Sequence, residues 1–392
     1  MKILHSYPYF YPAWSFGGAV RAVYDVSKLL TLRGHEVTVY TSDGLDRRTR
    51  LIVDSNPTYV DGVRVYYFRN LSTHLLRFNI PLQLKMPIEI RRSIREFDII
   101  HLTGYPHFQN IVLHYYAKKY DIPYVLQAQG AATAFIHRAL SKGIFDRLWG
   151  RNLLRDASKL VAVSTFEANQ YKNLGISTDK IQIIPNGIDL SFFNHLPLKG
   201  KFRTKLSMDK DEKIILYLAR IHKIKGVDLL VRAFGACLRR IHNATLVVAG
   251  PDDGFLPAIK QLIEELHLND KVILTGPLYG NDKLEAYVDA DVYVLPSIYE
   301  AFGVTVLEAC ACGTPVIITN RCGMADAVNN NAGIVVPYDQ EKLQEAIIKM
   351  ITVEGLAKKH GDNARALVGE CYNWDKIVTQ IEGLYNNVVA AK

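Results

Sequence analysis

The feature that most constrains the fold is a regular alternation of short apolar runs with longer helical segments along the whole chain. Many of these runs are apolar on both faces, as in the buried strands of parallel sheets. The repeated strand–helix alternation predicts a doubly wound α/β fold. The expected strands are Lys2–Ser6, Glu36–Thr41, Val63–Phe68, Asp98–Leu102, Pro123–Gln127, Lys159–Ser164, Lys213–Leu218, Thr245–Ala249, Lys271–Thr275, Asp291–Leu295, Pro315–Thr319 and Gly333–Val336.

The alternation is interrupted once, by a polar stretch without clear periodicity at residues 190–213. We therefore expect two Rossmann-like domains in tandem, residues 1–195 and 196–373, followed by a final helix within 374–392. Ligands of open parallel sheets bind at the carboxyl ends of the strands, so the expected site is the cleft between the two domains.

Composition excludes several classes of protein. Hydrophobic residues make up 49% and charged residues 22%, which is ordinary for a soluble globular protein and excludes a disordered chain. No apolar run approaches the roughly 18–20 residues of a spanning helix, and the first residues do not resemble a secretion signal. The five cysteines lack paired CxxC spacing, which predicts a reducing compartment and no zinc site. We expect a cytoplasmic protein.

The positive charge is concentrated in the first half of the chain. The net charge is +8, and residues 1–195 hold 24 Lys and Arg against 15 Asp and Glu. Such an excess favours an anionic partner, either a membrane surface or a phosphorylated lipid, and no nucleic-acid motif is present. Arg147, Arg151, Arg155 and Lys159 recur every four residues among apolar residues. They predict either a basic helix lying on anionic lipid or an ordinary surface helix.

The strongest motif begins directly after the expected strand Asp291–Leu295 and opens a helix at Gly303. The first N–H groups of that helix, near Val304 to Val306, and its dipole predict an anion site suited to a diphosphate. Glu300 and Glu308 flank this site, and each carboxylate can accept hydrogen bonds from sugar hydroxyls. A nucleotide sugar has this layout. A glycosidase pair, the competing interpretation, needs two carboxyl groups across one bond, which this spacing does not favour.

Two further motifs follow other expected strands. Arg220 and Lys225 follow Lys213–Leu218 and can neutralise the charge that develops on a departing diphosphate. Gly17 and Gly18 precede the first long helix and allow a phosphate or sugar to approach closely. The pair is not a GxGxxG fingerprint, which argues against a nicotinamide-dependent dehydrogenase.

Together these motifs resemble glycosyltransferase family 4, over nearly the whole chain. The resemblance implies the GT-B fold, an α/β architecture of two Rossmann-like doubly wound domains that face each other across a cleft. The matching stretches are Gly17-Gly18, Ile184–Asp189, Arg220 with Lys225, Glu300 through Glu308, and Ala309–Val316.

The resemblance implies a retaining transferase that uses a nucleotide sugar. It implies that Glu300 holds the donor sugar, Glu308 the ribose, and Arg220 and Lys225 the diphosphate. The remaining donor contacts that it implies are Gly17, Gly18, Gly250, Leu278, Phe302, Gly303, Val304 and Thr305. It also implies that the final helix packs back on the first domain.

The chain departs from the family pattern at one position. Many relatives carry a His after the strand that we expect at Pro123–Gln127, whereas Gln129 stands here and can hydrogen-bond but cannot act as a base. His101 ends another expected strand and is a candidate for an active-site role, with a structural His as the alternative. No metal is implied, because the Asp289-Ala290-Asp291 triplet leads into a strand.

We therefore expect a hexosyltransferase that needs neither a metal nor another cofactor. Its expected partners are a nucleotide-diphosphate sugar, a lipid-linked or glycan acceptor and an anionic membrane surface, but no nucleic acid. This predicts polysaccharide or glycan assembly, peripherally on the cytoplasmic face of a membrane. The alternatives are a transferase with a soluble sugar-phosphate acceptor, a nucleotide-sugar epimerase of the same fold, or a binding protein without activity. The base (UDP, GDP or ADP), the sugar and the linkage stay open.

Overall fold

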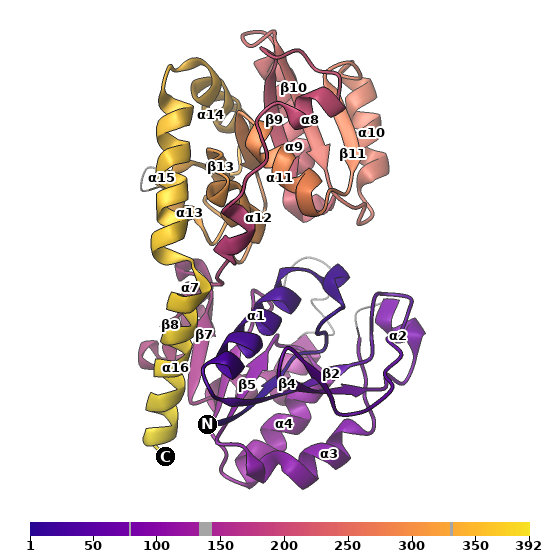
Figure 1. Cartoon of the computed structure of the whole chain (residues 1–392), viewed down its shortest axis with the longest axis vertical. Coiled ribbons are helices and arrows are strands. Elements are labelled where there is room, and N and C mark those ends of the chain that lie inside the picture. Colours follow the sequence, from indigo (N-terminus) through magenta and orange to yellow (C-terminus); the bar gives the residue numbers. More distant parts are fainter. Residues whose placement is uncertain (78–79, 133–142, 330–331) are drawn as a thin grey trace. The chain divides into compact units, whose positions relative to one another are not determined.

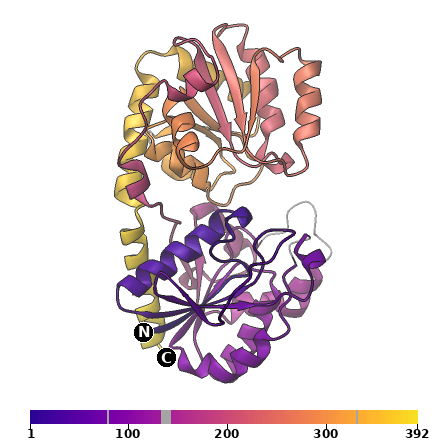
Figure 2. The same ribbon diagram turned by 45° about the vertical axis from the view of Figure 1, so that its right-hand side comes forward.

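The computed structural model describes residues 1–77, 80–132, 143–329 and 332–392. The chain forms two compact units, residues 1–187 with 374–392 and residues 188–373 (Figures 1 and 2). The boundary lies at Gly187/Ile188 rather than at the expected position near residue 195. Ile188 donates a backbone hydrogen bond to Tyr372 of the second unit (2.8 Å), which explains why the chain enters that unit earlier.

The first unit contains an eight-stranded sheet in the order β3-β4-β2-β1-β5-β6-β7-β8. All neighbouring strands are parallel except the short hairpin of β3 with β4. The strands are β1 Lys2–Ser6, β2 Glu36–Ser42, β3 Thr58–Val60, β4 Val63–Phe68, β5 Ile99–Thr103, β6 Tyr124–Gln127, β7 Lys159–Ala162 and β8 Ile181–Ile183. Its α-helices are α1 Gly18–Leu32, α2 Thr73–Arg77, α3 Met86–Ser93, α4 Phe108–Lys119, α6 Arg151–Arg155, α7 Thr165–Asn173 and α16 Trp374–Ala390.

The second unit contains a six-stranded, fully parallel sheet in the order β11-β10-β9-β12-β13-β14. The strands are β9 Lys213–Leu218, β10 Ala244–Ala249, β11 Val272–Gly276, β12 Val292–Leu295, β13 Val316–Thr319 and β14 Gly333–Val336. The α-helices are α8 Lys201–Lys205, α9 Val227–Cys237, α10 Leu256–Glu265, α11 Gly280–Asp289, α12 Val304–Ala311, α13 Ala325–Asn329, α14 Gln340–Thr352 and α15 Leu356–Cys371. The expected class of two doubly wound α/β domains is confirmed.

Each sheet has one topological switch point. In the first unit the chain moves from β1 outward to β2 and β4 and then returns to place β5 on the other side of β1. In the second unit β9, β10 and β11 extend one way, and β12 then pairs with the opposite side of β9. Ligands of such sheets bind where the strand order reverses, at the carboxyl ends of the strands. The β1/β5 and β9/β12 positions are therefore where sites are expected.

The last helix, α16, completes the core of the first unit (Figure 1). It lies against α1, and its inward face carries apolar side chains that are almost fully buried. The polar ring of Tyr385 enters this core as well, with its Oη 2.9 Å from His5 Nε2 and 2.6 Å from His101 Nδ1. The buried apolar residues of the helix are Trp374, Ile377, Val378, Ile381, Leu384 and Val388.

The basic segment 147–159 is only partly helical. A π-helical turn spans Asp146–Gly150, and α6 ends at Arg155. Lys159 belongs to β7 instead, and its Nζ donates to the carbonyl of Asp179 (2.6 Å). The expected stripe of four cations is therefore wrong at Lys159, because the helix ends before it. None of the helices in the described ranges is long and apolar enough to cross a membrane.

Truncation of Leu384 tests whether α16 belongs to the first core. Because Leu384 is 1% exposed, we expect Leu384→Ala to lower the free energy of unfolding of that unit by about 2–5 kcal/mol. The measurement is urea unfolding, with Asn387→Ala on the exposed face of the same helix as the control. Equal, small effects of the two variants would contradict a core role for the helix.

Candidate functional site

The β9/β12 switch point brings together two loops that carry several of the expected donor residues. The loop after β9 contains Arg220 and Lys225, and the loop after β12 contains Glu300. The two loops touch directly, because the Ile298 N–H donates to the Ile224 carbonyl (2.8 Å). Topology therefore places this part of the expected site where a doubly wound sheet binds ligands.

Two glycines permit the close approach of these loops. Gly226 has φ +69°, and a Cβ at this position would lie 2.0 Å from the Pro296 carbonyl oxygen. Gly250 follows β10 with φ +151°, and a Cβ there would lie 1.8 Å from the Ala219 carbonyl oxygen. No residue with a side chain fits either position without moving the loops. Gly250 thus has a steric role beside the expected phosphate-binding loop.

The cations of the first loop are paired with carboxylates. The Arg220 guanidinium forms an ion pair with Asp253, and half of its side chain is exposed. The Lys225 ammonium forms an ion pair with Glu300, and both side chains are mostly buried. The backbone of Glu300 is held in turn by the loop after β13, since its N–H donates to the Arg321 carbonyl (3.0 Å) and its carbonyl accepts from Gly323 (2.8 Å).

The start of α12 supplies the expected anion site. Gly303 precedes the helix with φ +98°, and no side chain caps the first turn. The Val306 N–H donates to the Gly303 carbonyl (3.0 Å), so among the described residues the N–H groups of Val304 and Thr305 are the ones available to an anion. Thr305 is fixed by Tyr293, whose Oη lies 2.8 Å from Thr305 Oγ1 and 3.1 Å from the Leu218 carbonyl oxygen. Phe302 is 4% exposed and anchors the loop before the helix.

Glu308 lies in the second turn of α12 and is held by two residues of α11. Lys283 Nζ is 2.6 Å from one carboxylate oxygen, and Tyr287 Oη donates to the other (3.1 Å). Burial raises the pKa of Tyr287 well above its ordinary value, and the Glu308 carboxylate reinforces this shift. Tyr287 therefore remains a protonated donor that orients Glu308.

Sequence reasoning missed several of these partners. Asp253, the partner of Arg220, follows β10. Lys283 and Tyr287 are four residues apart on one face of α11, a spacing that could have indicated that they share a partner. The expected base contact, Leu278, is half-buried after β11, and its neighbour Tyr279 is 72% exposed. An exposed ring next to the expected base position could stack on a nucleobase.

In the first unit, Gly17 and Gly18 lie where the β1 loop enters α1, at the β1/β5 switch point. Gly17 has φ +98° and precedes the helix, whose first turn has no side-chain cap. The loop before it is rich in aromatic rings, and Tyr9 stacks on Phe16 with ring centroids 3.5 Å apart. This arrangement leaves a helix N-terminus at the carboxyl edge of the first sheet.

Gln129 forms a reciprocal amide pair. Its Nε2 donates to Asn186 Oδ1 (3.1 Å), and Asn186 Nδ2 donates to Gln129 Oε1 (3.0 Å). The pair joins the loop after β6 to the loop after β8. Beyond this pair, the described residues leave one N–H and one lone pair of the Gln129 amide for a ligand. A substrate-binding role for Gln129 stays a prediction.

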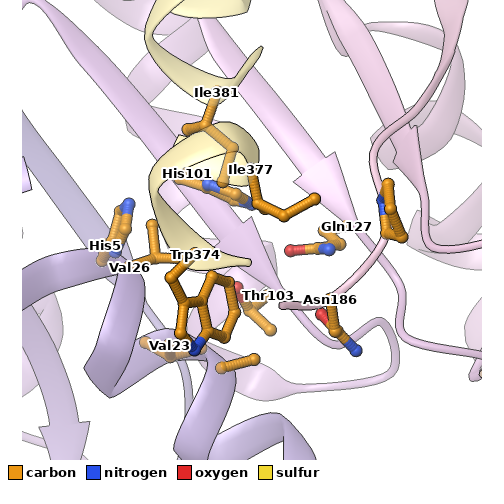
Figure 3. Close-up of a pocket in the computed structure, with 12 residues that line it drawn as sticks. His5, Val23, Val26, His101, Thr103, Gln127, Asn186, Trp374, Ile377 and Ile381 are labelled. Atoms are coloured by element: carbon orange, nitrogen blue, oxygen red, sulfur yellow. The ribbon is translucent and has the colours of Figure 1, made fainter. Parts of the chain in front are cut away.

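His101 is 3% exposed and faces a cavity of about 10 Å³ behind α16, lined by residues of the first unit (Figure 3). This volume holds about one water molecule and no sugar. Burial lowers the pKa of His101 to about 4, so its ring is neutral at physiological pH. His101 Nδ1 contacts Tyr385, and Nε2 has no hydrogen-bond partner among the described residues. These contacts favour the structural alternative, and an active-site role stays a prediction.

Among the residues that the structure describes, no group of three or more His, Cys, Asp or Glu side chains could hold a metal ion. The Asp291 carboxylate of the DxD triplet accepts hydrogen bonds from Arg203 (2.9 Å) and from the backbone N–H of Ile214 (2.9 Å). This carboxylate therefore fixes the start of β12.

Comparisons with known proteins identify the family. The family model for Glycosyltransferase Family 4 matches residues 16–192, and the model for Glycosyl transferases group 1 matches residues 199–367. The chain belongs to glycosyltransferase family 4. It is a glycosyltransferase of the GT-B fold, as the sequence motifs predicted.

Similar proteins align with this family 4 chain over almost its full length. An uncharacterized glycosyltransferase of Methanocaldococcus jannaschii, MJ1607, is 29% identical over 96% of this chain and 95% of its own length. A D-inositol 3-phosphate glycosyltransferase of Kineococcus radiotolerans is 28% identical over 93% of this chain and 88% of its own. The Anabaena protein Alr3699/HepE, solved with UDP and glucose, has a TM-score of 0.77 at 20% identity, covering 99% and 100% of the two chains. That likeness supports the fold.

Substitution of Gly226 tests the close approach of the two loops. We expect Gly226→Ala to lower nucleotide affinity at least tenfold, because its Cβ would collide with the Pro296 carbonyl. Gly254→Ala is the matched control, since Gly254 also has positive φ (+88°) but has no atom within 4 Å of the added Cβ. Both variants carry the ~1–2 kcal/mol cost of a left-handed residue. Calorimetric titration with UDP, GDP and ADP should separate them, and equal affinities would contradict the steric argument.

Proposed function

We propose that this chain transfers a hexosyl group, with retention of configuration, from a nucleoside-diphosphate sugar to a lipid-linked acceptor at an anionic membrane surface, in polysaccharide or glycan assembly. The observation that carries the donor half is the Lys225–Glu300 ion pair beside the uncapped start of α12. This brings together a cation (Lys225), a carboxylate that can accept hydrogen bonds from sugar hydroxyls (Glu300) and an anion-binding helix end, all at the switch point of one sheet.

The donor half of the proposal follows from charge. A diphosphate at the start of α12 meets backbone N–H groups and the helix dipole, with Lys225 and Arg220 supplied by the neighbouring loop. Glu308, oriented by Tyr287, accepts ribose hydroxyls, and Glu300 accepts those of the sugar. Complexes of the Anabaena protein HepE with UDP and with UDP-glucose support this class of donor.

In the proposed reaction the bond between the anomeric carbon and the diphosphate oxygen breaks, and a bond to the acceptor oxygen forms on the same face. The acceptor proton passes to the departing phosphate oxygen. Arg220, Lys225 and the α12 N-terminus stabilise the negative charge that develops there. Since these groups supply the positive charge, we propose that transfer needs no metal.

The acceptor half of the proposal rests on an exposed apolar and basic surface at residues 144–151, which we call the 144–151 surface. Ile144, Leu148 and Trp149 are 54%, 53% and 42% exposed. Arg147 and Arg151 are also exposed, and neither forms an ion pair with a described residue. Cations beside exposed Trp and Leu are typical of protein surfaces that bind anionic lipid.

The 144–151 surface is tied to the carboxyl edge of the first sheet. Tyr105, just after β5, donates a hydrogen bond to Asp146 (2.8 Å) and packs edge-on against Phe145 with ring centroids 5.3 Å apart. The surface therefore lies next to the β1/β5 switch point, where a ligand of this unit is expected. This placement supports an acceptor presented by a lipid surface.

A soluble sugar-phosphate acceptor is the second candidate. It is favoured by relatives named D-inositol 3-phosphate glycosyltransferase, 25–30% identical to this chain. The two candidates share the donor and differ in the acceptor, so one screen with both acceptors distinguishes them.

A donor screen with site variants tests the proposed reaction. We expect nucleotide release from one of UDP-glucose, GDP-mannose or ADP-glucose with a lipid extract as acceptor source, unchanged by excess EDTA, and little release with inositol 3-phosphate. Glu308→Ala should weaken nucleotide binding about 10–100-fold, because it removes a charged acceptor of ribose hydroxyls. Glu300→Ala should reduce turnover more than nucleotide affinity. Exposed Glu354→Ala is the control, and full activity of both site variants would refute the assignment.

Vesicle flotation tests the 144–151 surface. We expect binding to phosphatidylglycerol vesicles at low salt and none to phosphatidylcholine vesicles. Arg147→Ala/Arg151→Ala should weaken binding about thirtyfold, since each cation near an anionic surface contributes ~1 kcal/mol. Arg91→Ala/Arg92→Ala makes the same change of charge on exposed residues of α3 and is the matched control. Equal loss in both variants would indicate general charge attraction rather than a defined surface.

A further inference from the structure

The first unit contains a fully buried carboxylate that none of the roles above uses. Glu167 lies in the first turn of α7 and is 0% exposed. A buried carboxylate is costly unless hydrogen bonds satisfy it, so its partners indicate why it is there.

Both carboxylate oxygens of Glu167 accept backbone N–H groups. One accepts from Gly130 (2.5 Å), in the loop after β6, and the other accepts from Val163 (2.8 Å), directly after β7. One turn further along α7, Tyr171 Oη accepts the N–H of Ala128 (3.0 Å). Two side chains of one helix therefore hold Ala128 and Gly130 on either side of Gln129.

The segment between these two anchors has an unfavourable backbone conformation. Gln129 has φ +55° and Gly130 has φ +83°, so a residue with a side chain occupies the left-handed region. This conformation costs ~1–2 kcal/mol and persists only where surrounding contacts enforce it. The Gln129 amide is then presented to Asn186 at the carboxyl edge of the sheet. Residues held in such conformations cluster at ligand sites.

We propose that Glu167 is the positioning residue for the 128–130 loop, and that this loop forms part of the acceptor side of the transfer site. The inference rests on the proposed function. Glu167 itself touches no substrate in this view and acts by fixing the backbone at Gly130 and hence the direction of the Gln129 side chain.

The protonation state of Glu167 provides a distinctive signature. The ionised carboxylate accepts both N–H groups, whereas a protonated one carries an O–H that competes with one of them. Burial raises the pKa of Glu167 to about 7, against the opposing effect of the Val163 and Gly130 N–H groups and of Tyr171. These are the groups that face the carboxyl from α7 and from the two loops. Because the ionised fraction decreases as pH falls through 7, the transfer rate should decrease with it.

The experiment compares Glu167→Gln with the wild-type protein in three measurements. Hydrogen–deuterium exchange should accelerate at Gly130, whereas Ala128 stays protected by Tyr171. Transfer from the donor chosen by the screen, with lipid extract, should fall at least tenfold in kcat, and its decline below pH 7 should disappear. The affinity for nucleotide should change less than twofold. The paired side chains that we expect to bind the nucleotide sugar all belong to the second unit, whereas Glu167 belongs to the first.

Two further variants separate positioning from loss of stability. Ala168→Gly weakens the same helix at a buried position by about 1 kcal/mol without touching the loop, and it should leave the transfer rate and its pH profile unchanged. Tyr171→Phe should accelerate exchange at Ala128 and reduce transfer as well. The proposal is overturned if Glu167→Gln keeps the wild-type exchange at Gly130, or if its loss of transfer equals that of Ala168→Gly. If no donor turns over in the wild-type protein, the proposed function fails while the exchange measurement still tests the contact.

Discussion

The close approach of two loops at the β9/β12 switch point is the constraint on which the proposed donor site depends. Gly226 against the Pro296 carbonyl and Gly250 against the Ala219 carbonyl allow no Cβ, so three strand ends meet with their backbones nearly in contact. At that spacing Lys225 forms an ion pair with Glu300 of the other loop. The glycines thus determine the electrostatics of the site, although they carry no charge themselves.

The charged groups of this site form ion pairs with one another. Arg220 is paired with Asp253, Lys225 with Glu300, and Lys283 with Glu308. A diphosphate bound as proposed would exchange these partners. The electrostatic free energy of binding would then be the difference between two sets of ion pairs rather than the full attraction of a free cation. No side chain of the described residues caps the first turn of α12, which makes the helix end the part of the proposed site that favours an anion most directly.

Periodicity predicted much of this architecture, and the exceptions have physical causes. Buried parallel strands such as Val292–Leu295 and Val316–Thr319 could be predicted from sequence because both of their faces are buried and almost entirely apolar. The short edge strands Thr58–Val60 and Ile181–Ile183 are half-exposed and lack that pattern. Gly303 and Glu308 were found because a strand–loop–helix motif is local in sequence. Asp253 and Lys283 were missed because their partners lie 33 and 25 residues away in the sequence. They become neighbours when the second sheet forms. The burial of His101 was equally hidden, since it depends on Tyr385 at the far end of the chain.

The second unit is an insertion into the first, and the two places where the chain crosses between them are held side by side. Gly187 packs against the Trp374 ring so closely that a Cβ would lie 2.6 Å from it, and the next residue, Ile188, donates to the Tyr372 carbonyl. Trp374 is fixed further by its indole N–H, which donates to Asp25 of α1 (3.0 Å). Because the two ends of the inserted unit are adjacent, the insertion does not interrupt the core of the first unit. The chain leaves the first unit at Gly187 and re-enters it at Trp374, where α16 packs on α1. The contacts of Trp374 with Gly187 and with Asp25 therefore help to hold α16 in the core of the first unit.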